Sequence, residues 1–146
     1  QKADIKKEEG KVIYTNQDLI EQYNEAVKGL SASDWFEKGY KFGIAGNHKE
    51  ALNAFNKAIE LNPLSALAYD EIGMALLKMG KMEEAIAAYK NAAAIDPKFP
   101  QPHNHLGVAY LMQGETKEAD REFKLYEELT KEKKAEQAKI MGGPPH

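Results

Sequence analysis

The residues of this chain best suited to acid–base or metal chemistry are its four histidines, His48, His103, His105 and His146. His103 and His105 are two residues apart, and on a helix this spacing turns their side chains about 200° away from each other. Two histidines that hold one metal ion from a helix need a spacing of four residues. His48 and His146 have no evident catalytic partner. We therefore expect no metal site, and we interpret His103 as a packing residue.

Other reactive groups are also scarce. The chain has no cysteine, which excludes disulfides, thiolate metal sites, iron–sulfur clusters and a cysteine nucleophile. Its glycines do not form the GxxxxGK or GxGxxG patterns of phosphate-binding loops. Neighbouring acids such as Glu83–Glu84 and Glu127–Glu128 are expected on exposed helix faces, where they keep the chain soluble. We therefore expect a protein that is not an enzyme and that uses no cofactor.

The composition is that of one globular domain. The chain has 146 residues, of which 42% are hydrophobic and 29% charged, and it lacks an apolar run of the roughly 18–20 residues that span a bilayer. The formal net charge is −3, and Arg121 is the only arginine. Bidentate phosphate clamps are therefore nearly unavailable, and we expect neither nucleic-acid binding nor a membrane span.

Small and aromatic residues recur with a period of 34 residues and no insertion. A fixed period of this length is the signature of a repeat architecture. The aligned columns are Gly39, Gly73 and Gly107; Gly46, Gly80 and Gly114; Ala51, Ala85 and Ala119; Phe55, Tyr89 and Phe123; and Pro63 with Pro97.

Each repeat is predicted to form two amphipathic helices, A and B, because its apolar residues follow helical spacing. The second glycine lies where the end of helix A needs a left-handed backbone. The first glycine lies inside helix A, where it costs about 1 kcal/mol relative to alanine and is expected only if a neighbour approaches closely. The aromatic column is expected to fill the space between successive helix pairs, and the prolines end helix B.

This pattern resembles the tetratricopeptide repeat family over residues 32–133. The resemblance implies an all-α superhelix, or α-solenoid, of three helix-turn-helix repeats at residues 32–65, 66–99 and 100–133. It is carried by Trp35, Gly39, Phe42, Ala51, Phe55, Ala58 and Pro63; by Tyr69, Ile72, Gly73, Leu76, Ala85, Tyr89, Ala92 and Pro97; and by Leu106, Gly107, Tyr110, Ala119 and Phe123.

Three residues depart from the family pattern. Lys38 replaces an aliphatic residue, His103 replaces an aromatic residue, and Lys131 replaces the terminating proline. Without that proline, the last helix is predicted to run from Lys117 to about Lys139. Residues 134–146 are thus expected to be a helix extension followed by a disordered tail.

The segment before the repeats is predicted to contain one further helix. Residues 15–31 are expected to form an N-terminal amphipathic helix that begins at a capping box of Thr15 and Asp18. This helix could cap the open end of the solenoid, lie in the groove of this molecule or of a neighbour, or dock on a partner. Residues 1–14 are expected to be a flexible tail, in which the β-prone stretch 11–15 has no visible strand to pair with.

The resemblance also implies a binding surface, because the A helices of this family line a concave groove that binds an extended or helical peptide. Phe36 and Tyr40 are candidate anchors, and Asp70 with Glu71 forms an expected acidic patch. The predicted ligand is an apolar or amphipathic segment of a protein, which can carry a lysine or arginine. The candidate groove residues are Phe36, Tyr40, Ile44, Leu67, Asp70, Glu71, Met74, Leu77, Asn104, His105, Val108 and Met112.

Some members of the family hold the C-terminal carboxylate of a chaperone with a clamp of lysine, asparagine and arginine residues. No such cationic clamp is expected here, since Asp70 and Glu71 would repel a carboxylate. The corresponding positions carry Phe36, Tyr40, Glu71, Gln101 and His105.

Two functions remain open at this point. The first is a protein-interaction module, an adaptor or assembly factor, and the alternative is a self-assembling scaffold that forms homo-oligomers through its N-terminal helix or its repeat surfaces. The stretch from Lys11 to Leu19 is similar to segments near the start of some exported bacterial proteins. That similarity slightly favours a prokaryotic source and an exported or periplasmic location over the cytoplasm.

Overall fold

The computed structural model describes the backbone of residues 6–8, 11–13 and 15–142, and the side chains of residues 15–142. The chain divides into two compact units, Gln1–Leu30 and Ser31–His146.

The first unit combines a short β-hairpin with one helix. Strand β1 (Lys6–Glu8) pairs antiparallel with β2 (Lys11–Ile13). The β-prone stretch therefore has a partner, contrary to the sequence-based expectation. Helix α1 (Asn16–Ala26) begins at the predicted capping box of Thr15 and Asp18, but it ends before residue 31, because a turn with a positive φ at Gly29 follows it.

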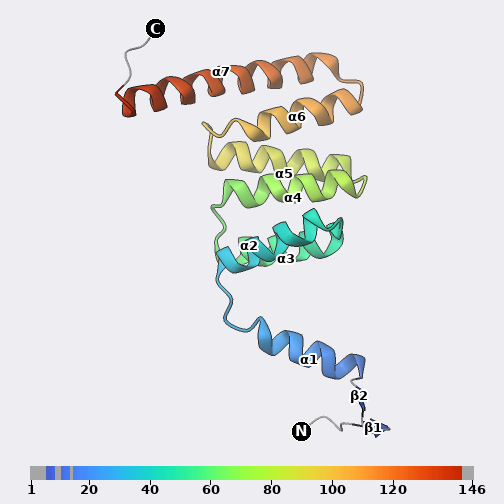
Figure 1. Cartoon of the computed structure of the whole chain (residues 1–146). Helices are drawn as coiled ribbons and strands as arrows, with labels where there is room; N and C mark the ends of the chain where they lie inside the picture. Colours follow the sequence, from blue (N-terminus) through green and yellow to red (C-terminus); the bar gives the residue numbers. More distant parts are fainter. Residues whose placement is uncertain (1–5, 9–10, 14, 143–146) are drawn as a thin grey trace. The chain divides into compact units, whose positions relative to one another are not determined.

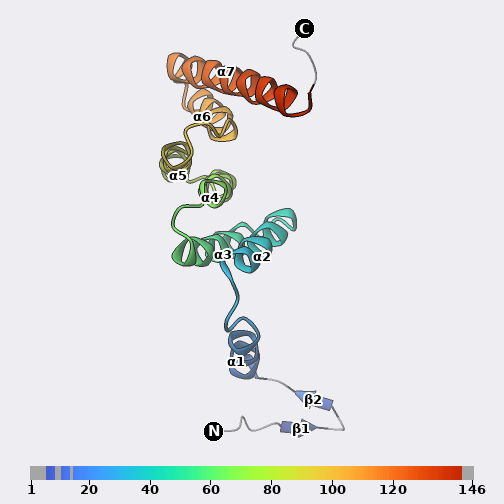
Figure 2. The same cartoon turned by 90° about the vertical axis from the view of Figure 1, so that its left-hand side faces the viewer.

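The second unit is a stack of helix pairs, and Figures 1 and 2 show the helices following one another in sequence order. Each predicted repeat contains one pair, so the predicted all-α solenoid of three repeats is confirmed. The A helices are α2 (Ala32–Ile44), α4 (Ala66–Lys78) and α6 (Gln101–Met112), and the B helices are α3 (His48–Leu61), α5 (Met82–Ile95) and α7 (Thr116–Ile140).

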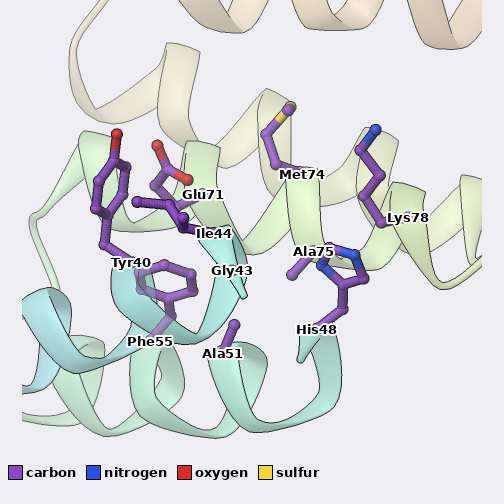
Figure 3. A pocket seen from close by; sticks show the side chains of 10 residues that line it. All are labelled: Tyr40, Gly43, Ile44, His48, Ala51, Phe55, Glu71, Met74, Ala75 and Lys78. Carbon is purple, nitrogen blue, oxygen red and sulfur yellow. The ribbon is translucent and has the colours of Figure 1, made fainter. Parts of the chain in front are cut away.

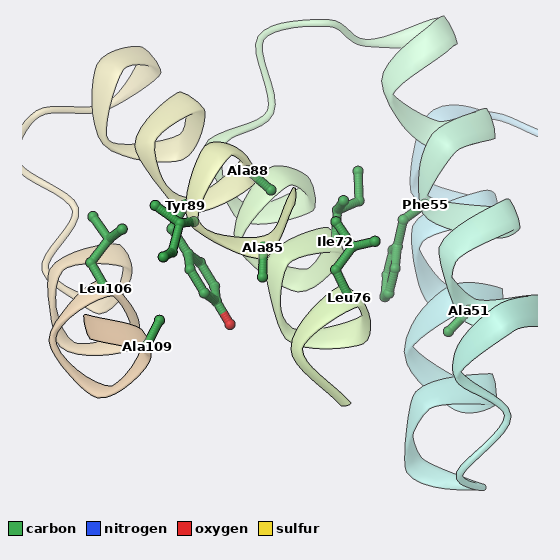
Figure 4. Packing of buried hydrophobic residues seen from close by; sticks show 10 residues of the cluster. Ala51, Phe55, Ile72, Leu76, Ala85, Ala88, Tyr89, Leu106 and Ala109 are labelled. Carbon is green, nitrogen blue, oxygen red and sulfur yellow. The ribbon is translucent and has the colours of Figure 1, made fainter. Parts of the chain in front are cut away.

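The glycines inside the A helices face aromatic rings of the B helices. A Cβ atom added to Gly39 would lie 2.7 Å from the ring of Phe55, and one added to Gly73 would collide with the ring of Tyr89. The ring of Tyr89 also lies 5.2 Å, centroid to centroid, from that of His105 in the next helix pair. The aromatic residue thus packs within its own pair and against the next one. These contacts form one buried cluster that runs through the three pairs (Figure 4).

Helix α2 differs from the other A helices on one face. Three positions of the repeat hold buried residues in α4 and in α6 but charged residues in α2. Since α2 is the first A helix of the unit, these positions are the ones that pack against a preceding pair where one exists. In α4 they are Ala68, Ile72 and Ala75, and in α2 they are Asp34, Lys38 and Lys41.

The last helix runs past the repeat, as the missing proline predicts. Helix α7 spans Thr116–Ile140, close to the predicted range of 117–139, and Gly142 follows it with a φ of 74°. Its last turns, from residue 131 onward, are exposed throughout. None of the helices in the described part of the chain is long and apolar enough to cross a membrane.

Candidate binding groove

An open pocket with a volume of about 190 Å³ lies between the C-terminal halves of α2 and α4 and the start of α3 (Figure 3). Four of the twelve predicted groove residues line it, namely Tyr40, Ile44, Glu71 and Met74. The structure therefore brings these four side chains together. The other lining residues are Gly43, His48, Ala51, Phe55, Ala75 and Lys78.

His48 is a lining residue that sequence reasoning missed. The predicted groove residues lie on the A helices alone, whereas His48 is the first residue of helix α3. The turn at Gly46, which has a φ of 83°, brings the start of α3 back beside the end of α2. The glycine column was the signal that could have identified His48 as a lining residue.

A second hollow of about 210 Å³ lies between the N-terminal halves of α2 and α4 and the end of α3. Phe36 and Leu67, both predicted groove residues, line it. The ring of Phe36 lies 5.4 Å from that of Phe55, centroid to centroid, and Phe55 lines the first pocket. The Phe36–Phe55 pair thus connects the two hollows.

Asp70 does not contribute a free charge to this groove. Only 3% of its surface is exposed, and its Oδ1 accepts a hydrogen bond of 2.8 Å from Nδ1 of His105. Asp70 is therefore a structural partner of His105 across the junction of the second and third pairs. The sequence predicts an acidic patch of Asp70 and Glu71, and this prediction is corrected here. Only Glu71 lines the pocket.

Glu71 is half-buried and lines the first pocket. Burial raises the pKa of its carboxyl group above 4.5, and the charge of Asp70 raises this pKa further, whereas His105 opposes both effects. Its carboxylate forms no hydrogen bond or salt bridge with another side chain of residues 15–142. The pocket thus contains a carboxylate that has no hydrogen-bond or salt-bridge partner among the side chains of residues 15–142.

Tyr89 carries the other unsatisfied polar group of this region. Its ring is fully buried, and its hydroxyl is buried without a hydrogen-bond partner among the described residues. Burial, followed by the charges of Asp70 and Glu71, raises the pKa of this phenol well above its usual range. We interpret Tyr89 as a core residue, since it is not among the residues that line the first pocket.

The third pair contributes less to the pocketed part of the groove. Val108 and Met112 are 40% and 61% exposed, and Leu77 and Asn104 are half-buried. These four predicted residues line neither hollow described above. They remain predicted contacts for a longer ligand.

His103 has a packing position, as its place in the repeat predicts. It is half-buried, and its Nδ1 lies 2.7 Å from Oε2 of Glu122 on α7. Helix α6 is thus bonded on one side to α4 through His105 and on the other to α7 through His103. Among the described residues, no group of three or more histidines and carboxylates could hold a metal ion.

Three family profiles match the chain. Residues 73–114 match one described as "TPR repeat", and residues 54–87 and 35–63 match two described as "Tetratricopeptide repeat". No curated protein sequence gives a significant match.

Several solved structures are similar to this one. A crystal structure of MamA shares 32% sequence identity and a TM-score of 0.71, and the match covers 82% of this chain and 71% of that one. The second TPR of Spaghetti (RPAP3), bound to the HSP90 peptide SRMEEVD, is 23% identical over 74% of this chain and 98% of that one, with a TM-score of 0.65. The Yersinia enterocolitica type III secretion translocator chaperone SycD is 23% identical over 67% of this chain and 74% of that one, with a TM-score of 0.65. At this identity the last two support the fold alone.

Proposed function

Because the chain belongs to the tetratricopeptide repeat family, we propose that it is a protein-interaction module, an adaptor or assembly factor, that binds a segment of a partner protein along its A helices. The observation that carries this proposal is the pocket between the first two helix pairs, which combines an apolar floor with exposed anchors at its rim. Tyr40 is 50% exposed and Ile44 is 73% exposed. Large apolar side chains next to a concave surface are typical of binding sites.

The side chains of this pocket suit a variable apolar ligand. Tyr40 offers a large contact area with few rotatable bonds, which is typical of residues that dominate binding energy. Met74 is flexible and adapts to ligands of different shape. An amphipathic helix or an extended apolar segment would fit this combination, whereas a C-terminal carboxylate placed at Glu71 would be repelled.

The test of this function is the double variant Tyr40→Ala/Met74→Ala. Affinity capture with the intact chain from its native lysate, followed by mass spectrometry, identifies partners, and titration of each partner measures its affinity. We expect the double variant to bind at least several-fold more weakly, because it loses two apolar contacts of the groove. Unchanged affinity would exclude this groove as the binding site.

The matched control removes two exposed leucines of B helices that do not line this pocket. Leu61 is 58% exposed and Leu125 is 41% exposed, and neither lines the pocket. The variant Leu61→Ala/Leu125→Ala should bind the partner like the unmodified chain. Circular dichroism should show the same helix content for all three proteins.

Self-assembly is the second candidate function, and one observation favours it. Helix α1 exposes Leu19 and Ile20, which are 51% and 52% exposed. Light scattering over a concentration series would distinguish the two functions. Oligomers of the full chain that become monomers on removal of residues 1–30 would support the scaffold, and a monomer in both cases would exclude assembly through α1.

A further inference from the structure

Glu71 and His105 occupy the same position in two successive A helices, one period apart. At the junction of the second and third pairs, His105 is hydrogen-bonded to Asp70 of the preceding A helix. At the junction of the first and second pairs, the position equivalent to Asp70 is Phe36, whose ring packs against Phe55. The repeat thus places an aromatic ring where a polar partner of Glu71 would be expected.

The pocket that contains Glu71 is polar at both ends and apolar between them. Figure 3 shows Glu71 beside Tyr40 at one end, and Lys78 with His48 at the other. Ile44 and Met74 contribute apolar surface to the same pocket. A ligand therefore meets a negative group at one end and basic groups at the other.

A half-buried carboxylate without a partner has lost part of its hydration and has gained no ion pair in return. A cationic group at the same place would restore a charge-assisted hydrogen bond, and an anionic group would be repelled. The volume of about 190 Å³ exceeds that of a cavity of about 150 Å³ that accepts a benzene ring. The pocket therefore has room for one aliphatic side chain beside the cation.

We propose that this pocket recognises a protein segment that presents a lysine or arginine to Glu71 and an adjacent leucine, isoleucine or methionine to the surface between Tyr40, Ile44 and Met74. This inference rests on the proposed function, because it names the chemistry of the ligand that the same groove binds. Charge complementarity selects the ligand: the basic side chain pairs with Glu71, and an acidic residue farther along the segment would meet His48 and Lys78.

The experiment pans a phage library of random dodecapeptides on the full chain. Binders that are lost on the Tyr40→Ala/Met74→Ala variant define the ligands of the groove. We expect these to carry a lysine or arginine next to an aliphatic residue. Synthetic versions should bind Glu71→Gln about ten-fold more weakly, and Glu83→Gln, which changes an exposed acid of α5, should bind them like the unmodified chain.

A matched pair of peptides isolates the charge. Replacing an arginine of the peptide by citrulline, or a lysine by acetyl-lysine, should weaken binding to the unmodified chain. The same replacement should have little further effect on Glu71→Gln, because both changes remove the same ion pair. Groove ligands that lack a basic residue, or that bind Glu71→Gln with unchanged affinity, would overturn this inference and leave the proposed function standing. A library without any groove-dependent binder would overturn both.

Discussion

Single positions in the A helices decide which polar groups are satisfied and which are available. Asp70 and His105 face each other across one junction, and Phe36 and Glu71 occupy the same two positions one period earlier. The same backbone arrangement therefore gives a hydrogen-bonded pair at the junction of the second and third helix pairs, and a carboxylate without a hydrogen bond at the junction of the first and second. The proposed ligand specificity follows from this difference between two equivalent positions.

Glu71→Gln should stabilise the free protein at neutral pH. Because burial raises the pKa of Glu71 in the folded state above 4.5, the folded protein holds this proton more tightly than the unfolded chain. The free energy of unfolding therefore decreases as the pH rises above 4.5, and it increases again on acidification. Thermal unfolding should give a higher Tm for Glu71→Gln at pH 7 and no gain below the ordinary pKa. A lower Tm at pH 7 would contradict the unpaired state of this carboxylate.

Gly73→Ala should destabilise the protein even though alanine favours helix by about 1 kcal/mol. The new methyl group would collide with the buried ring of Tyr89, and overpacking of this kind costs about 1–3 kcal/mol. Gly43 of α2 is the matched control, since a Cβ atom there meets nothing within 4 Å. Urea unfolding should show a loss for Gly73→Ala and a small gain for Gly43→Ala.

The sequence allowed part of this residue-scale detail to be predicted. The close contacts at Gly39 and Gly73 follow from the cost of glycine inside a helix, and the structure shows the contacting rings. The burial of Asp70 was missed because its partner, His105, lies one period and one residue farther on. A comparison of residues at that separation in successive A helices would have predicted the Asp70–His105 hydrogen bond from the sequence.

At the scale of elements, the charged face of α2 defines the start of the stack. The face that is buried in α4 carries Asp34, Lys38 and Lys41 in α2, so no preceding helix pair is needed to cover it. The helix bounds of the repeats and the long α7 could be predicted from glycine and proline positions. The hairpin could not, because Lys6–Glu8 is too polar to signal a strand.

Removal of residues 1–30 should leave the three helix pairs folded. Ser31 caps α2 through a capping box with Asp34, so the first repeat has its own helix start. Circular dichroism and urea unfolding should show a cooperative transition with nearly unchanged stability. A loss of cooperativity would mean that α1 contributes to the fold of the first repeat.

The whole stack is held together by contacts between neighbours. Within residues 31–142, helices contact the next helix in sequence or the next A helix. A stack of this kind transmits a local defect only to adjacent repeats, because stability is the sum of repeat and interface terms. Damage at one junction should thus loosen one end of the molecule.

His105→Ala tests this directly. It leaves Asp70 buried without its hydrogen-bond partner, at a cost of about 1–3 kcal/mol. Amide hydrogen exchange should accelerate in α6 and α7, with little change in α2 and α3. Uniform acceleration over all helices would show that the stack unfolds as a single unit, and replacing Asp70 as well should recover part of the loss.

The buried phenol of Tyr89 makes the middle of this stack observable without any label. Its hydroxyl has no partner among the described residues, and burial keeps it protonated far into the alkaline range. We therefore expect this hydroxyl to ionise only when the packing around the ring, against Gly73 and against His105, loosens and admits water. The chain has seven tyrosines, so the part of the tyrosinate absorbance that disappears in Tyr89→Phe is the part that reports the opening of this region.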